Sequence, residues 1–445
     1  MKSKSRHGLT LPGTLLAMSS LACAAGVAPA TLADEAAAPA YIVYDTGTLG
    51  GTFAFGSGVN DLGWVSGAST NATGALHAAL WSPGSVVDLG TLGGSNANSA
   101  VEWPVKNNHG LVVGISQGPA PDPLGETFSC ADFIPTNGDT CLPFLWQNGT
   151  LGQLPLLGGN NGFATEINNA GIAVGWAETA VHDPTCVSPQ VLQFLAVEWG
   201  PAANDKHVLP PFGSDSTSAA TAINDAGAVV GISGDCDVAV GAFSARHALL
   251  WLNGRPINLP TLGGQGWNTP MAISNDGIIV GFSDTPGDVV NGLLTANFQA
   301  ALWTRDGIVN LHTLPGDATA QATGVNNFAQ IVGTSFAANG SSRVFLWQDG
   351  TLYDLNTLVQ TNAPLYLLAT GDINDNGEIT GMGCVVVDGA CGSVLHTFVA
   401  IVAPAGVAQG SSQSERGTVR PAVPAALHEQ LQRYQRFGRR PERGS

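Results

Sequence analysis

A short motif recurs seven times along this chain of 445 residues, at intervals of roughly 50 residues. Each copy has an aliphatic residue, two short polar residues, a spacer and usually a glycine, as in Ile167-Asn168-Asn169 and the residues that follow. The copies lie at residues 59–63, 105–110, 167–171, 223–227, 273–277, 325–329 and 373–377. One unit of this size cannot bury its apolar face alone, so neighbouring units must pack on one another. The repeat constrains the architecture, but it does not specify a chemistry.

Each copy predicts two strands joined by a tight turn. An aliphatic-glycine step such as Val174-Gly175 follows the polar residues, and Asn, Asp and Gly tolerate the positive φ that hairpin turns require. A third apolar run ends in an aromatic residue, as at Trp251, and passes through Asn253-Gly254 into a short fourth run. Asn-Gly between apolar runs is the strongest short hairpin signal. The unit is therefore four short antiparallel strands.

We predict an all-β fold, a seven-bladed β-propeller of four-stranded blades over residues 41–403. Seven units lie within the typical range of about four to eight blades. The segment at residues 41–45 matches the fourth strand of a unit, whereas the last unit ends after its third strand, near Val402. Pairing of these two segments would complete the last blade and close the ring, which removes free sheet edges. The alternative is an open β-solenoid, in which the units stack without closing.

Further motifs recur in a constant order around the polar turn. They are His-Ala-Ala-Leu-Trp at residues 77–81 and Asp-Leu-Gly-Thr-Leu-Gly-Gly at residues 88–94. In this respect the chain resembles the bacterial extracellular HAF repeat proteins over residues 41–402. The histidine of that pattern is replaced at Leu142, Leu195, Gln299 and Ser342. The resemblance implies secretion and a repeat fold, and it implies no particular activity.

The N-terminus predicts export. Lys2, Lys4 and Arg6 precede an apolar stretch from about residue 9 to residue 27, which is the pattern of a secretory signal peptide. We assign residues 1–33 to this signal, with cleavage after Ala33; a lipoprotein signal ending at Cys23 is the alternative. No later segment has the roughly 18 apolar residues that a membrane helix needs. The expected location is extracellular, with the periplasm or the cell surface as alternatives.

Six cysteines remain after removal of the signal, and an even number in an exported protein favours disulfides. We expect Cys130 with Cys141 and Cys384 with Cys391 as local links within long loops. Cys186 and Cys236 occupy the same connection in neighbouring units and could bridge them. A metal site is not expected, because the Cys-x-x-Cys spacing with histidine that zinc sites use does not occur.

Charge limits the choice of partner. The chain has 33 Asp and Glu against 16 Lys and Arg, a formal net charge of −17. Nucleic acid is a poor partner for such a surface, whereas cations or neutral sugars fit better. Residues 404–445 form a link rich in Ser, Gly and Pro and a basic tail, which we expect to be disordered. We expect a monomer without a cofactor, bound to an extracellular glycan or protein.

The ligand surface is predicted on one side of the propeller. The connections between second and third strands are long in several units, and long loops on a regular scaffold often carry binding residues. The candidate ligand contacts in or beside these loops are Phe133, Trp176, Trp267, Asp235, Asp237 and Asp284. The main hypothesis is thus a binding module. A purely structural surface protein is a further alternative.

An enzyme is the other alternative, a glycoside hydrolase or polysaccharide lyase on the propeller scaffold. Hydrolysis needs two carboxylates about 5 to 10 Å apart. Only Glu102, Glu166 and Asp372, on predicted inner strands, are candidates for this role.

Several motifs are expected to be structural. His77, His247 and His396 recur at one repeat position, and a tryptophan ends most third strands, so hydrogen bonding and packing within the blades explain them. Residues 114–118 match the G-x-S-x-G pattern, but no helix is predicted to follow. Residues 372–383 resemble the start of a calcium loop, yet position twelve is Gly383 instead of an acid.

Overall fold

The computed structural model describes residues 39–126, 128–202, 204–237, 244–290, 293–295, 297–404 and 420–424. The predicted signal peptide at residues 1–33 and most of the tail at residues 404–445 lie outside this part of the chain. The described residues belong to one compact unit.

Five separate four-stranded antiparallel sheets follow one another along the chain. The first is β6 (Ser99–Ala100), β7 (Val112–Pro121), β8 (Asp139–Gln147) and β9 (Thr150–Gln153). The second is β10 (Gly158–Ile167), β11 (Ala173–His182), β12 (Leu192–Trp199) and β13 (Lys206–Leu209). The third is β14 (Thr217–Ile223), β15 (Val229–Gly234), β16 (His247–Leu252) and β17 (Arg255–Asn258). The fourth is β18 (Asn268–Ile273), β19 (Ile279–Asp284), β22 (Phe298–Thr304) and β23 (Gly307–His312). The fifth is β24 (Thr319–Val325), β25 (Ile331–Phe336), β26 (Ser342–Gln348) and β27 (Thr351–Asp354).

An eight-stranded sheet contains two further four-stranded sets. One set is β2 (Gly50–Val59), β3 (Val65–Asn71), β4 (Leu76–Ser82) and β5 (Ser85–Gly90). The other is β28 (Tyr366–Ile373), β29 (Ile379–Val387), β30 (Ala390–Val402) and β1 (Tyr41–Gly47). A single parallel pair, Phe53 with Leu395, joins the two sets. The small elements are the hairpin β20 (Val289–Val290) and β21 (Leu293–Leu294) and the helices α1 (Phe128–Ala131) and α2 (Leu355–Leu358).

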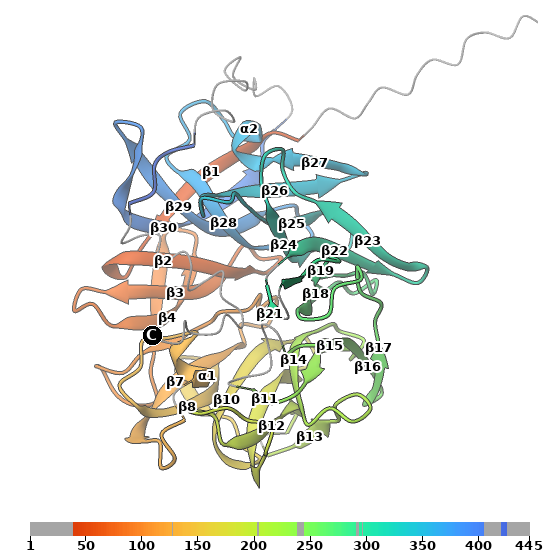
Figure 1. Ribbon diagram of the computed structural model, residues 1–445. Coiled ribbons are helices and arrows are strands. Elements are labelled where there is room, and N and C mark those ends of the chain that lie inside the picture. The colour runs from red at the N-terminus through yellow and green to blue at the C-terminus, as the bar shows by residue number, and fades with distance from the viewer. Residues whose placement is uncertain are drawn as a thin grey trace, which may run out of the picture. The chain divides into compact units, whose positions relative to one another are not determined.

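The N-terminal strand pairs with the last strand of the chain. β1 runs antiparallel to β30 from Tyr41 opposite Val402 to Gly47 opposite Thr397, and Figure 1 shows the red β1 beside the blue β30. This is the pairing that the sequence predicted for the two terminal segments. The expected all-β fold of four-stranded propeller sheets is confirmed.

The polar turns of successive repeats are hydrogen-bonded to one another. In each turn the second polar residue accepts, through Oδ1, the backbone N–H of the equivalent residue one repeat earlier, at 2.8 to 3.0 Å. We call these residues the turn ring: Asp61, Asn108, Asn169, Asp225, Asn275, Asn327 and Asp375. The last N–H, that of Asp375, donates to Asp61, 314 positions away in sequence. The side of the sheets that carries these turns is the turn side, and the opposite side, with the long connections, is the loop side.

The recurring histidines contact carboxylates of their own sheets or of the connection that precedes the sheet, as expected. His77 Nδ1 lies 2.8 Å from Asp88, and His396 Nδ1 lies 2.8 Å from Asp45. His247 Nδ1 lies 2.7 Å from Asp215. Several of the recurring tryptophans are also fixed within the fold: the indole N–H groups of Trp199, Trp251 and Trp303 donate to proline carbonyls at 2.7 to 2.8 Å.

The Leu-Gly-Gly segment has a steric explanation. In the repeat of β10 and β11, the backbone N–H groups of Asn160 and Asn161 donate to the Glu178 carboxylate at 3.1 and 2.9 Å. The chain can approach Glu178 this closely because residue 159 is glycine, and a Cβ there would overlap the Cβ of Glu178. The second glycine of the motif is therefore required for close packing.

We expect Gly159→Ala to destabilise the protein by about 1 to 3 kcal/mol, the usual cost of overpacking. Urea unfolding followed by tryptophan fluorescence measures this change. Gly152→Ala is the matched control, because a Cβ there meets only the Leu145 carbonyl oxygen, at 3.9 Å. Equal stability of the two variants would contradict the steric role of Gly159.

Candidate functional site

A pocket opens on the turn side, and every repeat contributes to its lining. The turn ring surrounds it, and the first polar residues of several turns lie beside the ring. One further residue per repeat, the last of each inner strand, also lines the pocket in six of the repeats. These residues are Val59, Ile167, Ile223, Ile273, Val325 and Ile373. Glu166 lines the pocket beside Ile167. The pocket is thus built by the repeat itself.

In the remaining repeat, Lys106 takes the place of the aliphatic residue. It lines the pocket and directly precedes Asn107, as Ile167 precedes Asn168 in the next repeat. The sequence interpretation gave this aliphatic position to Val105, because the copy at residues 105–110 has one extra residue. That alignment was wrong by one residue, and it hid the only basic side chain among the pocket-lining residues.

The Lys106 side chain reaches residues of other repeats. Its Nζ donates to the Val325 carbonyl at 2.7 Å and lies 3.0 Å from Oδ1 of Asp372. The Asp372 side chain is fully buried, whereas a quarter of the Lys106 side chain is exposed. Lys106 therefore connects distant repeats and shields a buried carboxylate from the pocket.

Glu166 is the second buried acid of this cluster. Its Oε2 accepts the backbone N–H of Ile223 at 2.9 Å, and only 4% of the residue is exposed. Burial raises the pKa of Glu166 to about 8, against the lowering effect of Lys106 and with a smaller raising effect of Asp372. Burial also raises the pKa of Asp372 to about 6, again with Lys106 opposing the shift. At neutral pH the cluster therefore contains a largely protonated Glu166 and an ionised Asp372 paired with Lys106.

Of the three predicted catalytic candidates, two come together. Glu166 and Asp372 interact electrostatically and share the influence of Lys106. Glu102 is partly buried and does not line the pocket. The geometry at the described residues thus gives one pair of buried acids with unequal pKa values, of which Glu166 lines the pocket and Asp372 does not.

The predicted aromatic contacts lie in the core of the loop side. Trp176 is 6% exposed and Trp267 is 2% exposed. Trp176 and Phe133 each pack against Phe163, with ring centroids 4.9 Å apart. Trp267 packs against Phe282 and Phe298 in the same apolar cluster. Trp176 and Trp267 therefore offer little surface to a ligand, whereas Phe133 is partly buried and packs against the cluster.

The predicted loop acids differ in their surroundings. Asp284 is fully buried, its pKa is raised by burial to about 7, and its Oδ1 accepts the N–H of Asn297 at 3.1 Å. Asp235, by contrast, is about half exposed and forms an ion pair with Arg246. Asp237 is partly buried, and its backbone N–H donates to the Thr185 carbonyl at 3.0 Å. The structure does not gather these acids into one site.

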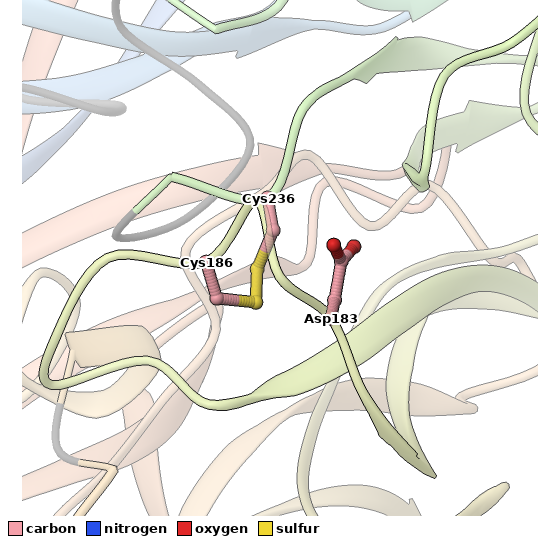
Figure 2. Close-up of side chains that lie close together, drawn as sticks. All are labelled: Asp183, Cys186 and Cys236. Carbon is pink, nitrogen blue, oxygen red and sulfur yellow. A yellow bond between two sulfur atoms is a disulfide. The ribbon is translucent and has the colours of Figure 1, made fainter.

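The three predicted disulfides are present: Cys130–Cys141, Cys186–Cys236 and Cys384–Cys391. The second joins the loop sides of two neighbouring sheets. Figure 2 shows this bond beside the Asp183 carboxylate. These three residues are the one close group of metal-ligating types within the described chain. Because the two sulfur atoms are bonded to each other, they are not thiolate ligands.

Comparison with known proteins gives no family. No protein-family model matches the chain, and no curated protein sequence matches it. Among the described residues, none of the helices is long and apolar enough to cross a membrane.

Solved structures show low similarity. A puromycin hydrolase is 12% identical with a TM-score of 0.39, over 75% of this chain and 50% of that one. A gluconolactonase from Xanthomonas campestris is 9% identical with a TM-score of 0.35, over 82% and 95% of the two chains. A polysaccharide lyase is 8% identical with a TM-score of 0.41, over 78% and 89%. The chain thus spans about half the length of the puromycin hydrolase, and similarity at this level transfers no activity to it.

We expect Lys106→Ile to lower the free energy of unfolding by about 3 kcal/mol at pH 7, because it leaves the buried Asp372 carboxylate without its cation. Adding Asp372→Asn to this variant should recover part of the lost free energy of unfolding, because the buried carboxylate charge is then removed as well. Chemical unfolding of the two single variants and the double variant gives the coupling energy. Additive effects would show that the ion pair does not stabilise the fold.

We expect the stability of the wild type to fall as the pH rises from about 5 to 8. Glu166 retains a proton in the folded state, with a pKa of about 8, over a range in which the unfolded chain has lost it at its ordinary value of 4.5. Glu166→Gln removes this contribution, so the variant should gain stability relative to the wild type as the pH rises. Urea midpoints at several pH values test this. Asp306→Asn changes an exposed acid and is the control, so its difference in stability from the wild type should not vary with pH. The same constant difference for Glu166→Gln would contradict the prediction.

Proposed function

We propose that this protein is an exported binding module and that the pocket on the turn side takes a neutral or amine-bearing sugar of an extracellular glycan. The observation that carries the proposal is the pocket itself, which is lined by amide and carboxylate groups from every repeat. Carbohydrate hydroxyl groups pair well with such groups, because each can both donate and accept a hydrogen bond. Several of these amide and carboxylate groups lie close together around the pocket.

The charge of the pocket supports a ligand without negative charge. Asp61, Asp225 and Asp375 lie in the turn ring, while the charge of Lys106 is already matched by Asp372. An incoming carboxylate or phosphate would meet a net negative surface. A neutral or cationic group would not be repelled.

Export is supported by two independent features. The N-terminal sequence has the pattern of a secretory signal, and three disulfides are typical of proteins from oxidising compartments. We also propose that the chain belongs with the HAF repeat proteins, on the motifs that recur in each unit.

A glycan array in which Asp225→Asn is compared with the wild type tests the binding proposal. We expect a loss of roughly tenfold or more in affinity, because a hydrogen bond to a charged group contributes about 1.5 to 3 kcal/mol. Asp306→Asn, an exposed acid in a turn that does not line the pocket, is the matched control and should bind like the wild type. If Asp225→Asn lowers the thermal stability, Asp61→Asn provides the same test from another repeat. Binding only to uronic acids, or equal binding by all variants, would refute the assignment.

An enzyme is the second candidate, favoured by one observation. Glu166 and Asp372 have pKa values of about 8 and 6, and carboxyl groups with separated pKa values are a pattern of acid and base catalysts. Glu166 lines the pocket, but Asp372 is fully buried and does not line it, which speaks against direct contact of both acids with a substrate. Turnover of a polysaccharide that is lost in Glu166→Gln, with folding intact, would favour this candidate over the binding module.

A further inference from the structure

A short segment of the C-terminal tail is docked on the loop side of the last two repeats. This segment is Arg420–Pro424, and 15 residues lie between it and the end of the preceding described stretch, at residue 404. The Ala422 N–H donates to the Gly389 carbonyl at 3.1 Å, and the Cys391 N–H donates to the Ala422 carbonyl at 2.9 Å. Ala422 thus pairs with Ala390 in the parallel direction, as an added strand would.

The receiving hairpin is held by covalent and apolar contacts. β29 and β30 meet in this hairpin, and the Cys384–Cys391 disulfide links them near its tip. Val423 packs against the apolar cluster that includes both cysteines. The tail segment therefore contributes a backbone pairing at Ala422 and the apolar side chains of Pro421 and Val423 to this surface.

Arg420 completes a cluster of four charges. Its guanidinium forms an ion pair with the fully buried carboxylate of Asp317, and Nη1 donates to Ser341 at 3.0 Å. Arg343 contacts the same carboxylate at 2.9 Å and also Asp354 at 3.0 Å. The negative charges of Asp317 and Asp354 are then balanced by the positive charges of Arg343 and Arg420. Without Arg420 the cluster would retain an excess negative charge on a buried group, which is unfavourable.

We propose that this surface is a peptide-binding groove and that the tail segment occupies it as an intramolecular ligand. The groove consists of Asp317, Ser341, the hairpin edge at residues 389–391 and the apolar contact for Val423. It selects an extended peptide in which an arginine is followed, three positions later, by a small aliphatic residue. The tail has this pattern at Arg420 and Val423.

The docked segment is suited to displacement by another peptide. Its contacts in the described residues are one ion pair, one side-chain hydrogen bond, two backbone hydrogen bonds and the apolar side chains of Pro421 and Val423, and Ala422 and Pro424 remain exposed. A contact of this size binds weakly by itself. Tethering raises the local concentration of the segment to the millimolar range, so a weak ligand fills the groove in most molecules.

A labelled peptide with the sequence of residues 418–426 tests the groove on the full-length protein. We expect it to bind the Arg420→Ala protein about tenfold more tightly than the wild type, because the intramolecular competitor is weakened there. The same peptide with alanine in place of arginine should bind neither protein. Arg246→Ala, which breaks an exposed arginine and aspartate pair elsewhere, should behave like the wild type.

Val423→Asp provides a second route if Arg420→Ala fails to fold, because it displaces the tail and leaves the arginine available. It should also increase binding of the added peptide. Absence of peptide binding to both variants would overturn the proposal. A dimer that forms with rising protein concentration and that Arg420→Ala abolishes would overturn the intramolecular assignment, since a second copy would then supply the segment. Glycan binding at the turn side is expected to be unchanged in these variants, so the two proposals fail independently.

Discussion

The turn ring is the interaction on which the remaining structure depends. Each backbone N–H in the ring donates to an Asn or Asp side chain of the following repeat, and the last returns to Asp61. A second set of bonds lies beside it, in which the first asparagine of a turn donates through Nδ2 to a carbonyl of the next turn, as Asn168 does to Asn224. Ser274 has no amide and makes no such bond onward, yet the ring continues through Asn275 and Asn327. The ring therefore fixes the order and spacing of the inner strands.

This use of the repeated polar residues limits what they can do for a ligand. Oδ1 of Asn169 is taken up by the N–H of Asn108, and its Nδ2 donates to Asp225. The ring can therefore offer a ligand only the lone pairs that its carboxylate and amide oxygens have left, and other chemistry comes from the departures from the repeat. Lys106 is such a departure, and it brings with it the buried pair of Asp372 and Glu166. The exceptional residues thus add a charged cluster to a pocket that the repeat itself builds.

The sequence predicted the architecture because its signals are local. Turn residues, aliphatic-glycine steps and terminal aromatic residues each act within a few positions, and the pairing of β1 with β30 followed from matching two short segments. The site was harder to predict, because one extra residue before Asn107 shifted the alignment and concealed Lys106. The burial of Trp176 and Trp267 could not be predicted from local sequence signals either. Inner strands such as β14, Thr217–Ile223, consist mostly of small residues, so large rings from elsewhere must fill the centre on the loop side.

The two sides of the sheets are stabilised by different means, and this difference separates their functions. On the turn side, short turns and the ring leave polar groups around a pocket, and all three disulfides lie on the other side. In the described part of the loop side, the long connections are held by disulfides, by aromatic packing and by local hydrogen bonds such as those that Glu126 accepts from Val191 and Leu192. At the hairpin of residues 389–391, the segment at residues 420–424 pairs with the backbone and packs Val423 against the apolar cluster. A small polar ligand therefore suits the turn side, whereas an extended peptide suits the loop side.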